Sequence, residues 1–300
     1  MGQVVVLGLI SGGIYAIFAL GVVLVFRGSG VLSFAQGEIG TVSLYLAYWL
    51  VSSRHLPWVV GALGAVVFAT AIGAAFEFGV VRRMVAADPV STAVATVGLA
   101  LFLLAGEFFL FGASPRDLPA PTRAGVELFG VRVSPTQIAA LVLALALGFG
   151  LQAVLRRTDF GLGILAAAQD PAAVRLVGVP LSRVTLTIWS AGAALSGLAA
   201  LLVEPTVGFV TPGYASELFI VGLAAAVIGG LTSLPGAFVG GVVLGLAEAA
   251  ATHWFGQYGL PGLRYVVVLF VLLVVLLGRA YAPEVRRRLA QPAAPAAVSA

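Results

Sequence analysis

The hydrophobic positions of this chain fall in long, unbroken runs, not in the alternating pattern of half-buried strands. Most runs approach the roughly 20 residues that a helix needs to cross a bilayer. Only helices and closed barrels satisfy the backbone inside lipid, and runs without alternation favour helices. We therefore predict an all-α polytopic membrane protein with about nine spans (eight to ten). The predicted spans are 2–26, 31–50, 58–81, 90–111, 134–155, 184–203, 217–230, 237–255 and 264–278.

Two of these runs differ from ordinary spans. Segment 217–230 is short and rich in glycine, so we expect a broken or re-entrant helix there. Segment 31–50 begins with the polar residues Ser33, Gln36 and Glu38, so its first turns should face away from lipid.

Composition narrows the class of protein. The chain is 61% hydrophobic and only 9% charged, whereas soluble domains carry about 25% charged residues. These proportions exclude a soluble enzyme, a disordered protein and a nucleic-acid-binding protein. The chain has no Cys, its 16 basic residues are all Arg, and His55 and His253 lie far apart. Because a P-loop ATPase needs a Lys, the chain cannot hydrolyse ATP by that route. We expect a non-catalytic chain without a metal or cofactor of its own.

The distribution of arginine predicts the orientation, because cytoplasmic loops are enriched in positive charge. With the N-terminus outside, eleven arginines lie on the cytoplasmic side and five on the opposite side. We therefore expect an external N-terminus, a cytoplasmic C-terminus and an odd number of spans. The cytoplasmic set is Arg27, Arg82, Arg83, Arg156, Arg157, Arg175, Arg183, Arg279, Arg286, Arg287 and Arg288; the outer set is Arg54, Arg116, Arg123, Arg132 and Arg264.

Four acidic residues fall within or near predicted spans: Glu38, Glu77, Glu107 and Glu248. A charge at the bilayer centre costs roughly 2.5–3.5 kcal/mol, so these side chains should face protein or water. We expect Glu77 to pair with the nearby Arg82 or Arg83. Glu248 has no Arg close in sequence and is expected to bond backbone freed at a broken helix. Glu38 either lines a path or is a structural acid.

The loop at 156–183 has the local signals of short helices. Leu162 to Gln169 form one predicted helical piece, and a second follows, with Asp170 as N-cap, Pro171 at the first position and Gly178 as the C-terminal stop. The loop is either a connector or a docking surface for a cytosolic partner. Glycines four residues apart, such as Gly8 and Gly12, predict either close helix packing or an opening for a path.

Five stretches, in order along the chain, resemble the permease subunits of branched-chain amino-acid ABC importers of the leucine/isoleucine/valine type. They are residues 8–21 (GLISGGIYAIFALG), 31–38 (VLSFAQGE), 77–82 (EFGVVR), 167–179 (AAQDPAAVRLVGV) and 227–248 (VIGGLTSLPGAFVGGVVLGLAE). The sequence departs from the family pattern at Ser33, where Asn is usual, at Gln36, where His is usual, and at Leu165, where Arg is frequent.

The resemblance implies a permease in the bacterial inner membrane that works by alternating access. It implies a second homologous permease as a heterodimer partner, two cytosolic ATPase subunits that bind the ATP, and a periplasmic substrate-binding protein. On this basis residues 1–288 form one permease domain, and 156–183 is its coupling loop. The Ala- and Pro-rich composition of 289–300 predicts a disordered tail. Expected coupling residues are Asp170, Pro171, Arg175, Leu176 and Gly178. Candidates for the translocation path are Ser33, Gln36, Glu38, Gly229, Gly230 and Glu248.

Three alternatives stay open from the sequence. A permease of the same architecture could carry urea, short amides or sugars. A stand-alone secondary transporter or channel would need a coupling-ion site and no ATPase. A membrane-embedded enzyme would need clustered His or Asp residues, which the sparse polar residues disfavour.

Overall fold

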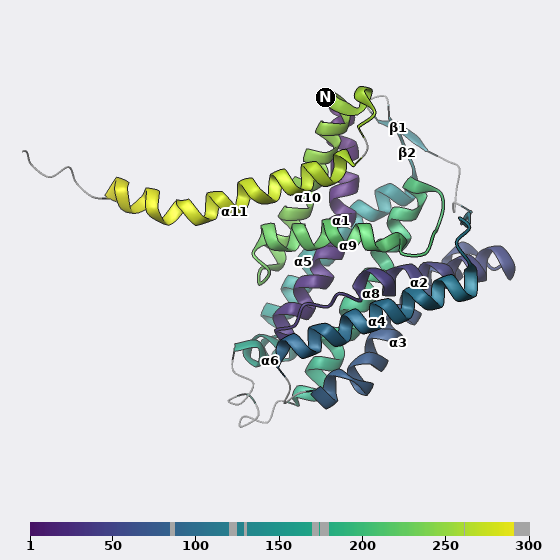
Figure 1. The fold of residues 1–300 in the computed structure, drawn as a ribbon, viewed down its shortest axis with the longest axis horizontal. Helices are drawn as coiled ribbons and strands as arrows, with labels where there is room; N and C mark the ends of the chain where they lie inside the picture. Colours follow the sequence, from purple (N-terminus) through teal and green to yellow (C-terminus); the bar gives the residue numbers. More distant parts are fainter. Residues whose placement is uncertain are drawn as a thin grey trace, which may run out of the picture.

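A computed structural model describes residues 1–84, 88–119, 125–128, 131–169, 174, 180–260 and 262–290. These residues form a helical bundle, so the predicted all-α membrane fold is confirmed (Figure 1). The long helices are α1 (Gly2–Ser29), α2 (Gln36–Tyr48), α3 (Trp58–Gly79), α4 (Pro89–Phe111), α5 (Pro135–Arg157), α6 (Asp159–Gln169), α8 (Leu181–Val207), α9 (Tyr214–Gly229), α10 (Leu234–Phe255) and α11 (Leu263–Ala290). Short π or 3-10 turns lie at Trp49–Ser53, Val81–Met84 and Gly256–Tyr258.

A helix lies over each predicted span. In the described part of the chain, six helices are long and apolar enough to cross a membrane: α1, α3, α4, α5, α8 and α10. The predicted count of about nine spans is therefore not established. Helix α9 has only 16 residues, as its short apolar run predicted. It is bounded by Gly213 and Gly230, which both have a left-handed backbone (φ 73° and 94°) that side chains disfavour.

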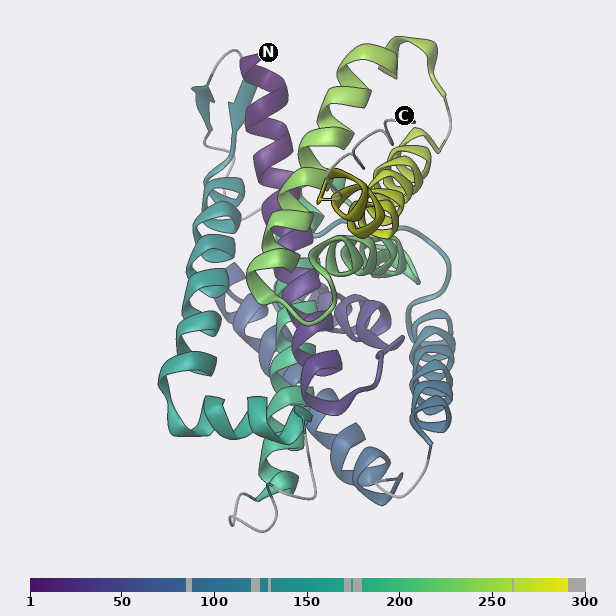
Figure 2. The same ribbon diagram turned by 90° about the vertical axis from the view of Figure 1, so that its left-hand side faces the viewer.

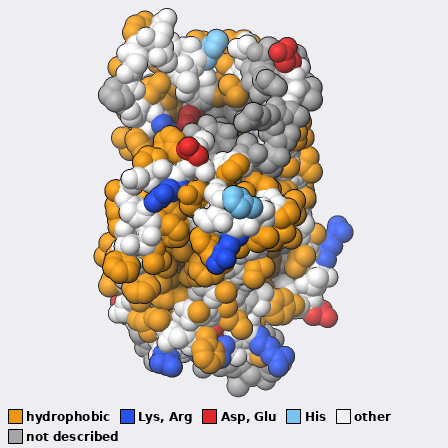
Figure 3. Space-filling model, turned by 90° about the vertical axis from the view of Figure 1, so that its right-hand side faces the viewer, with side chains coloured by type: hydrophobic (Ala, Val, Ile, Leu, Met, Phe, Trp, Pro, Cys, Tyr) orange, Lys and Arg blue, Asp and Glu red, His pale blue; other side chains and the backbone are white. Residues whose placement is uncertain are grey.

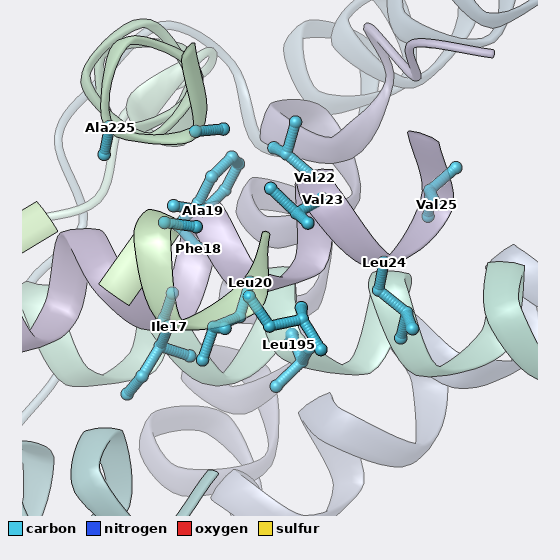
Figure 4. Close-up of a cluster of buried hydrophobic side chains, with 14 of the residues drawn as sticks. Ile17, Phe18, Ala19, Leu20, Val22, Val23, Leu24, Val25, Leu195 and Ala225 are labelled. Atoms are coloured by element: carbon cyan, nitrogen blue, oxygen red, sulfur yellow. The ribbon is translucent and has the colours of Figure 1, made fainter. Parts of the chain in front are cut away.

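The N-terminal helix α1 is the centre of the molecule. It contacts α10, α8, α5 and α9 (Figure 2). The side chains from Ile14 to Val25 are almost completely buried, including Ile17, Phe18 and Leu20. Figure 4 shows these side chains beside Leu195 of α8 and Ala225 of α9. Packing on α1 therefore links helices that are far apart in the sequence.

Glycines allow α1 and α10 to touch through their backbones. A Cβ added at Gly12 would lie 2.8 Å from the Val242 Cα, and one added at Gly241 would lie 2.5 Å from the Ala16 nitrogen. Glycine spacing of this kind allows close helix approach in lipid. At these positions the close-packing interpretation of the glycine pattern is confirmed.

Hydrophobic side chains are exposed along α3, α4, α5 and α11. On the face drawn in Figure 3, hydrophobic side chains cover more of the surface than charged ones do. Only 11% of the most apolar stretch of α4 is buried, against 83% for α1. Apolar side chains on the outside of the bundle are expected where the outer helices face lipid. Helix α11 extends sideways from the rest of the bundle, beside α9 (Figure 1).

The loop before α5 contains a small hairpin that the sequence analysis did not predict. Strand β1 (Val126–Leu128) pairs antiparallel with β2 (Val131–Val133). Helix α5 then begins with a capping box, in which Ser134 and Gln137 bond reciprocally. Earlier in the same loop, Arg116 exchanges backbone hydrogen bonds with Val210 at 2.9 and 2.8 Å, which ties the loop to the α8–α9 connection.

The predicted helical piece at 162–169 is confirmed as the C-terminal part of α6, which begins earlier, at Asp159. The expected coupling residues Asp170, Pro171, Arg175, Leu176 and Gly178 lie outside the described residues. The same holds for 291–300, most of the predicted disordered tail.

Candidate functional site

A cavity of about 490 Å³ lies where α1, α9, α10 and α11 meet the α8–α9 connection. Its polar wall comes from four helices, with Tyr15 on α1, Glu217 on α9, Glu248 on α10 and Arg264 on α11. Its apolar wall includes Ile14, Val203, Phe209 and Leu218. The cavity therefore combines charges of both signs with a hydrophobic surface inside a membrane bundle.

The Arg264 guanidinium is the centre of the polar wall. Its Nε lies 3.0 Å from Glu248 Oε1, and its Nη1 lies 3.5 Å from Glu217 Oε2. Its Nη2 donates to the Tyr15 hydroxyl, which in turn donates to Glu248 Oε2 at 2.5 Å. The guanidinium carbon also lies 5.4 Å from the centre of the Tyr15 ring. The three side chains of α1, α10 and α11 thus form one closed network.

Burial changes across this network. The Tyr15 side chain is almost fully buried, whereas 21% of the Glu248 side chain, 29% of the Arg264 side chain and 60% of the Glu217 side chain are exposed. Glu217 therefore lies at the mouth of the cavity and Tyr15 at its inner end. A solute entering from the mouth would meet both carboxylates and the guanidinium.

The predicted hydrogen-bond partner of Glu248 was wrong. Glu248 does not bond backbone freed at a broken helix; it pairs with Arg264, because the turn after α10 brings the start of α11 back beside it. Tyr15, Glu217 and Arg264 were not among the candidate residues. The sequence did contain a signal for the Glu248–Arg264 pair. Glu248 lies near the end of one apolar run, and Arg264, of opposite charge, lies at the start of the next run.

A second buried polar cluster holds the N-terminus of α9. The first N–H groups of a helix have no partner within it. Here the Gly213 N–H donates to Glu107 Oε2 at 2.9 Å, and the Ala215 N–H donates to Thr41 Oγ1 at 2.9 Å. The Ser216 hydroxyl donates to Glu38 Oε1. Side chains of α2 and α4 therefore satisfy the start of a short helix inside the protein.

The six path candidates are not brought together. Glu248 lines the cavity. Ser33, Gln36 and Glu38 are buried around the start of α2 and are not among the residues that line the cavity. Gly229 and Gly230 lie at the far end of α9, where a Cβ on Gly229 would be 2.2 Å from the Ala237 nitrogen of α10. A path role for each of these residues stays a prediction.

The expected partner of Glu77 is confirmed. Arg82 Nη2 lies 3.4 Å from Glu77 Oε2, and the Thr185 hydroxyl donates to Glu77 Oε1 at 2.7 Å. The carboxylate has no exposed surface, so these contacts to a neighbouring turn and to α8 compensate its burial.

Comparison with known proteins gives a consistent result. A family model described as "Branched-chain amino acid transport system / permease component" matches residues 4–276. The chain is 28% identical to the high-affinity branched-chain amino acid transport system permease protein BraD of Pseudomonas aeruginosa, over 95% of this chain and 97% of BraD. It is 25% identical to the corresponding permease protein LivH of Escherichia coli K12, over 93% of this chain and 95% of LivH.

A partial match is named for the import of a different solute. The chain is 32% identical to the autoinducer 2 import system permease protein LsrC of Klebsiella pneumoniae, over 60% of this chain and 48% of LsrC. No solved structure matches the chain.

Proposed function

Because the chain belongs to the permease-component family of branched-chain amino acid transport systems, we propose that it is the membrane subunit of an ABC importer for branched-chain, hydrophobic amino acids. The observation that carries this proposal is a cavity lined by both charged and aliphatic side chains inside a helical bundle of that family. Such a cavity suits a small solute with a charged end and an apolar end.

The energy for transport comes, in this proposal, from separate subunits. The chain has no Lys and therefore no P-loop, so two cytosolic ATPase subunits bind and hydrolyse the ATP. A periplasmic binding protein delivers the amino acid and sets most of the specificity. A second, homologous permease completes the path, with the N-termini outside and the C-termini in the cytoplasm of a bacterial inner membrane.

The packing of α6 supports the 156–183 segment as the coupling loop. Helix α6 contacts α5, α8 and α1. Ile164 and Ala167 of α6, together with Val174 in the loop, are buried in the same hydrophobic core as Tyr15. Packed cores transmit displacement, because their side chains have few voids to move into. A push by an ATPase on this loop is thereby conveyed to α1, which forms one wall of the cavity.

A permease for urea, short amides or sugars is the alternative, and the partial match to a permease named for autoinducer 2 import favours keeping it. The ionic groups of the cavity weigh against a neutral solute. An uncharged ligand that enters among Glu217, Glu248 and Arg264 displaces water from these ionic groups and offers them no opposite charge in return.

Reconstitution tests the proposal. The complete complex, with both permeases, both ATPases and the binding protein, should accumulate radiolabelled leucine in proteoliposomes only when ATP is supplied on the ATPase side. Omission of the ATPases is the matched control and should abolish accumulation. Leucine accumulation by this chain alone, or accumulation of urea or a sugar in place of leucine by the complex, would contradict the proposal.

A further inference from the structure

We propose that the cavity wall formed by Tyr15, Glu248 and Arg264 is the transit site for the charged backbone groups of the amino acid, an inference that rests on the proposed function. Arg264 would hold the α-carboxylate, and Glu248 would accept the α-ammonium group. The guanidinium fork matches a carboxylate in two parallel hydrogen bonds. Arg264 and Glu248 both line the cavity, and the Arg264 Nε lies 3.0 Å from the Glu248 Oε1.

The count of charges in the wall fits an exchange of partners. Two carboxylates, Glu217 and Glu248, surround one guanidinium. When an amino acid enters, its carboxylate replaces Glu248 on Arg264, and the released Glu248 carboxylate takes the ammonium group. Glu217 at the mouth is the first acidic group that the incoming ammonium meets. Every charge has a partner before and after the exchange, which avoids the cost of a buried, unpaired ion.

The rest of the cavity determines where the aliphatic side chain goes. Ile14 and Leu218 line the same space as the charged residues and are nearly fully buried. Phe209 adds an aromatic surface that is partly exposed. A volume of about 490 Å³ lies within the range of roughly 300–1,000 Å³ that is typical of small-molecule sites. An amino acid therefore fits with its backbone at Arg264 and its side chain against the apolar wall.

The exchange also explains how such a site avoids holding its ligand too tightly. The amino acid must displace an existing ion pair and the hydrogen bonds of Tyr15 to both partners. The net gain on binding is therefore small. Conduction requires binding that is favourable enough for entry and weak enough for release.

Neutralising variants of the complete complex provide the first test. Glu248→Gln, Arg264→Gln and the double variant are compared with Arg54→Gln, which removes an exposed arginine outside the cavity. We expect each cavity variant, including the double, to lower ATP-driven leucine uptake at least about tenfold, while ATP hydrolysis stimulated by the loaded binding protein stays within about twofold. Arg54→Gln should keep normal uptake.

The double variant separates ligand binding from structural pairing. If the two charges serve only to neutralise each other, removing both should restore uptake, and that result would overturn the proposal. Normal uptake in either single variant would overturn it as well. Absence of ATP-driven leucine uptake by the unaltered complex would instead defeat the proposed function.

A second measurement, the protection of a thiol from alkylation, keeps all the charges of the cavity and so does not depend on the assembly of charge variants. The chain has no Cys, so Ser11→Cys places one thiol on the cavity wall with all charges retained. Millimolar leucine should slow alkylation of this thiol by a maleimide at least about threefold, and urea should not. A thiol at Ser53→Cys, on an exposed turn outside the cavity, is the control and should react at the same rate with or without leucine. Equal alkylation of Ser11→Cys with and without leucine would overturn the proposal.

Discussion

The backbone of Gly245 in α10 touches that of Gly12 in α1, so closely that a Cβ added at Gly245 would lie 2.3 Å from the Gly12 nitrogen. No side-chain rotation relieves such a contact, because the neighbouring atoms belong to the backbone. The separation of α1 and α10, and with it the position of Tyr15 relative to Glu248, depends on this glycine.

Gly245→Leu should therefore force α1 and α10 apart. We expect a loss of stability of about 1–3 kcal/mol, the usual range for overpacking, and a lower midpoint of thermal unfolding for the purified complex in detergent. Gly98→Leu is the matched control, because a Cβ at Gly98 in α4 meets nothing within 4 Å. Equal midpoints for the two variants would contradict the backbone contact.

Glu107→Ala should weaken the start of α9. Its carboxylate accepts the Gly213 N–H at 2.9 Å, and its loss leaves a partly buried donor without that partner. An unsatisfied buried donor costs about 1–3 kcal/mol. Glu107→Gln keeps an oxygen acceptor and should be closer to the unaltered protein. Thermal unfolding of the two variants checks the order, and a Gln variant as unstable as the Ala variant would refute it.

Arg82→Gln should destabilise the protein more than the double variant Glu77→Gln/Arg82→Gln. Among the described residues, removal of Arg82 alone leaves the Thr185 hydroxyl as the one side-chain donor to the fully buried Glu77 carboxylate. Neutralising both residues removes that uncompensated charge. The unfolding midpoints of the single and double variants form the measurement. A double variant less stable than Arg82→Gln would show that the carboxylate does not need its cation.

Substitution of Arg175 or Gly178 should uncouple ATP hydrolysis from transport. This prediction rests on the sequence pattern of the proposed coupling loop and on the packing of α6 against α1 and α8. We expect Arg175→Ala and Gly178→Val to keep membrane insertion and basal ATP hydrolysis while leucine uptake falls. Parallel assays of ATP hydrolysis and uptake in proteoliposomes measure the ratio. Undiminished uptake in both variants would count against the coupling role.

Contacts between residues close in sequence were the ones that the sequence could predict. Apolar runs located each helix, because a helix satisfies its backbone within its own segment. The Glu77–Arg82 pair was also predictable, because only five positions separate the two residues. The 126–133 hairpin had a local signal that was missed: Val126-Glu-Leu and Val131-Arg-Val alternate around the two residues between them.

The polar wall of the cavity could not be predicted in this way. Tyr15 and Arg264 are 249 positions apart, and they meet only because α1, α10 and α11 pack together. Tyr15 also lies in the middle of an apolar run, where an aromatic residue is ordinary core. The same limit applies to Glu107 and Gly213, which are 106 positions apart.

The central position of α1 has a consequence for biogenesis. Helix α1 leaves the ribosome long before it can contact all its neighbours, since α10 is made more than 200 residues later. During that interval the α10 contacts of Gly8 and Gly12, and the Glu248 partner of Tyr15, are not yet made. Helix α1 is therefore made early but can complete its packing only late. If translation stops before α10, the central helix α1 lacks its contacts with α10.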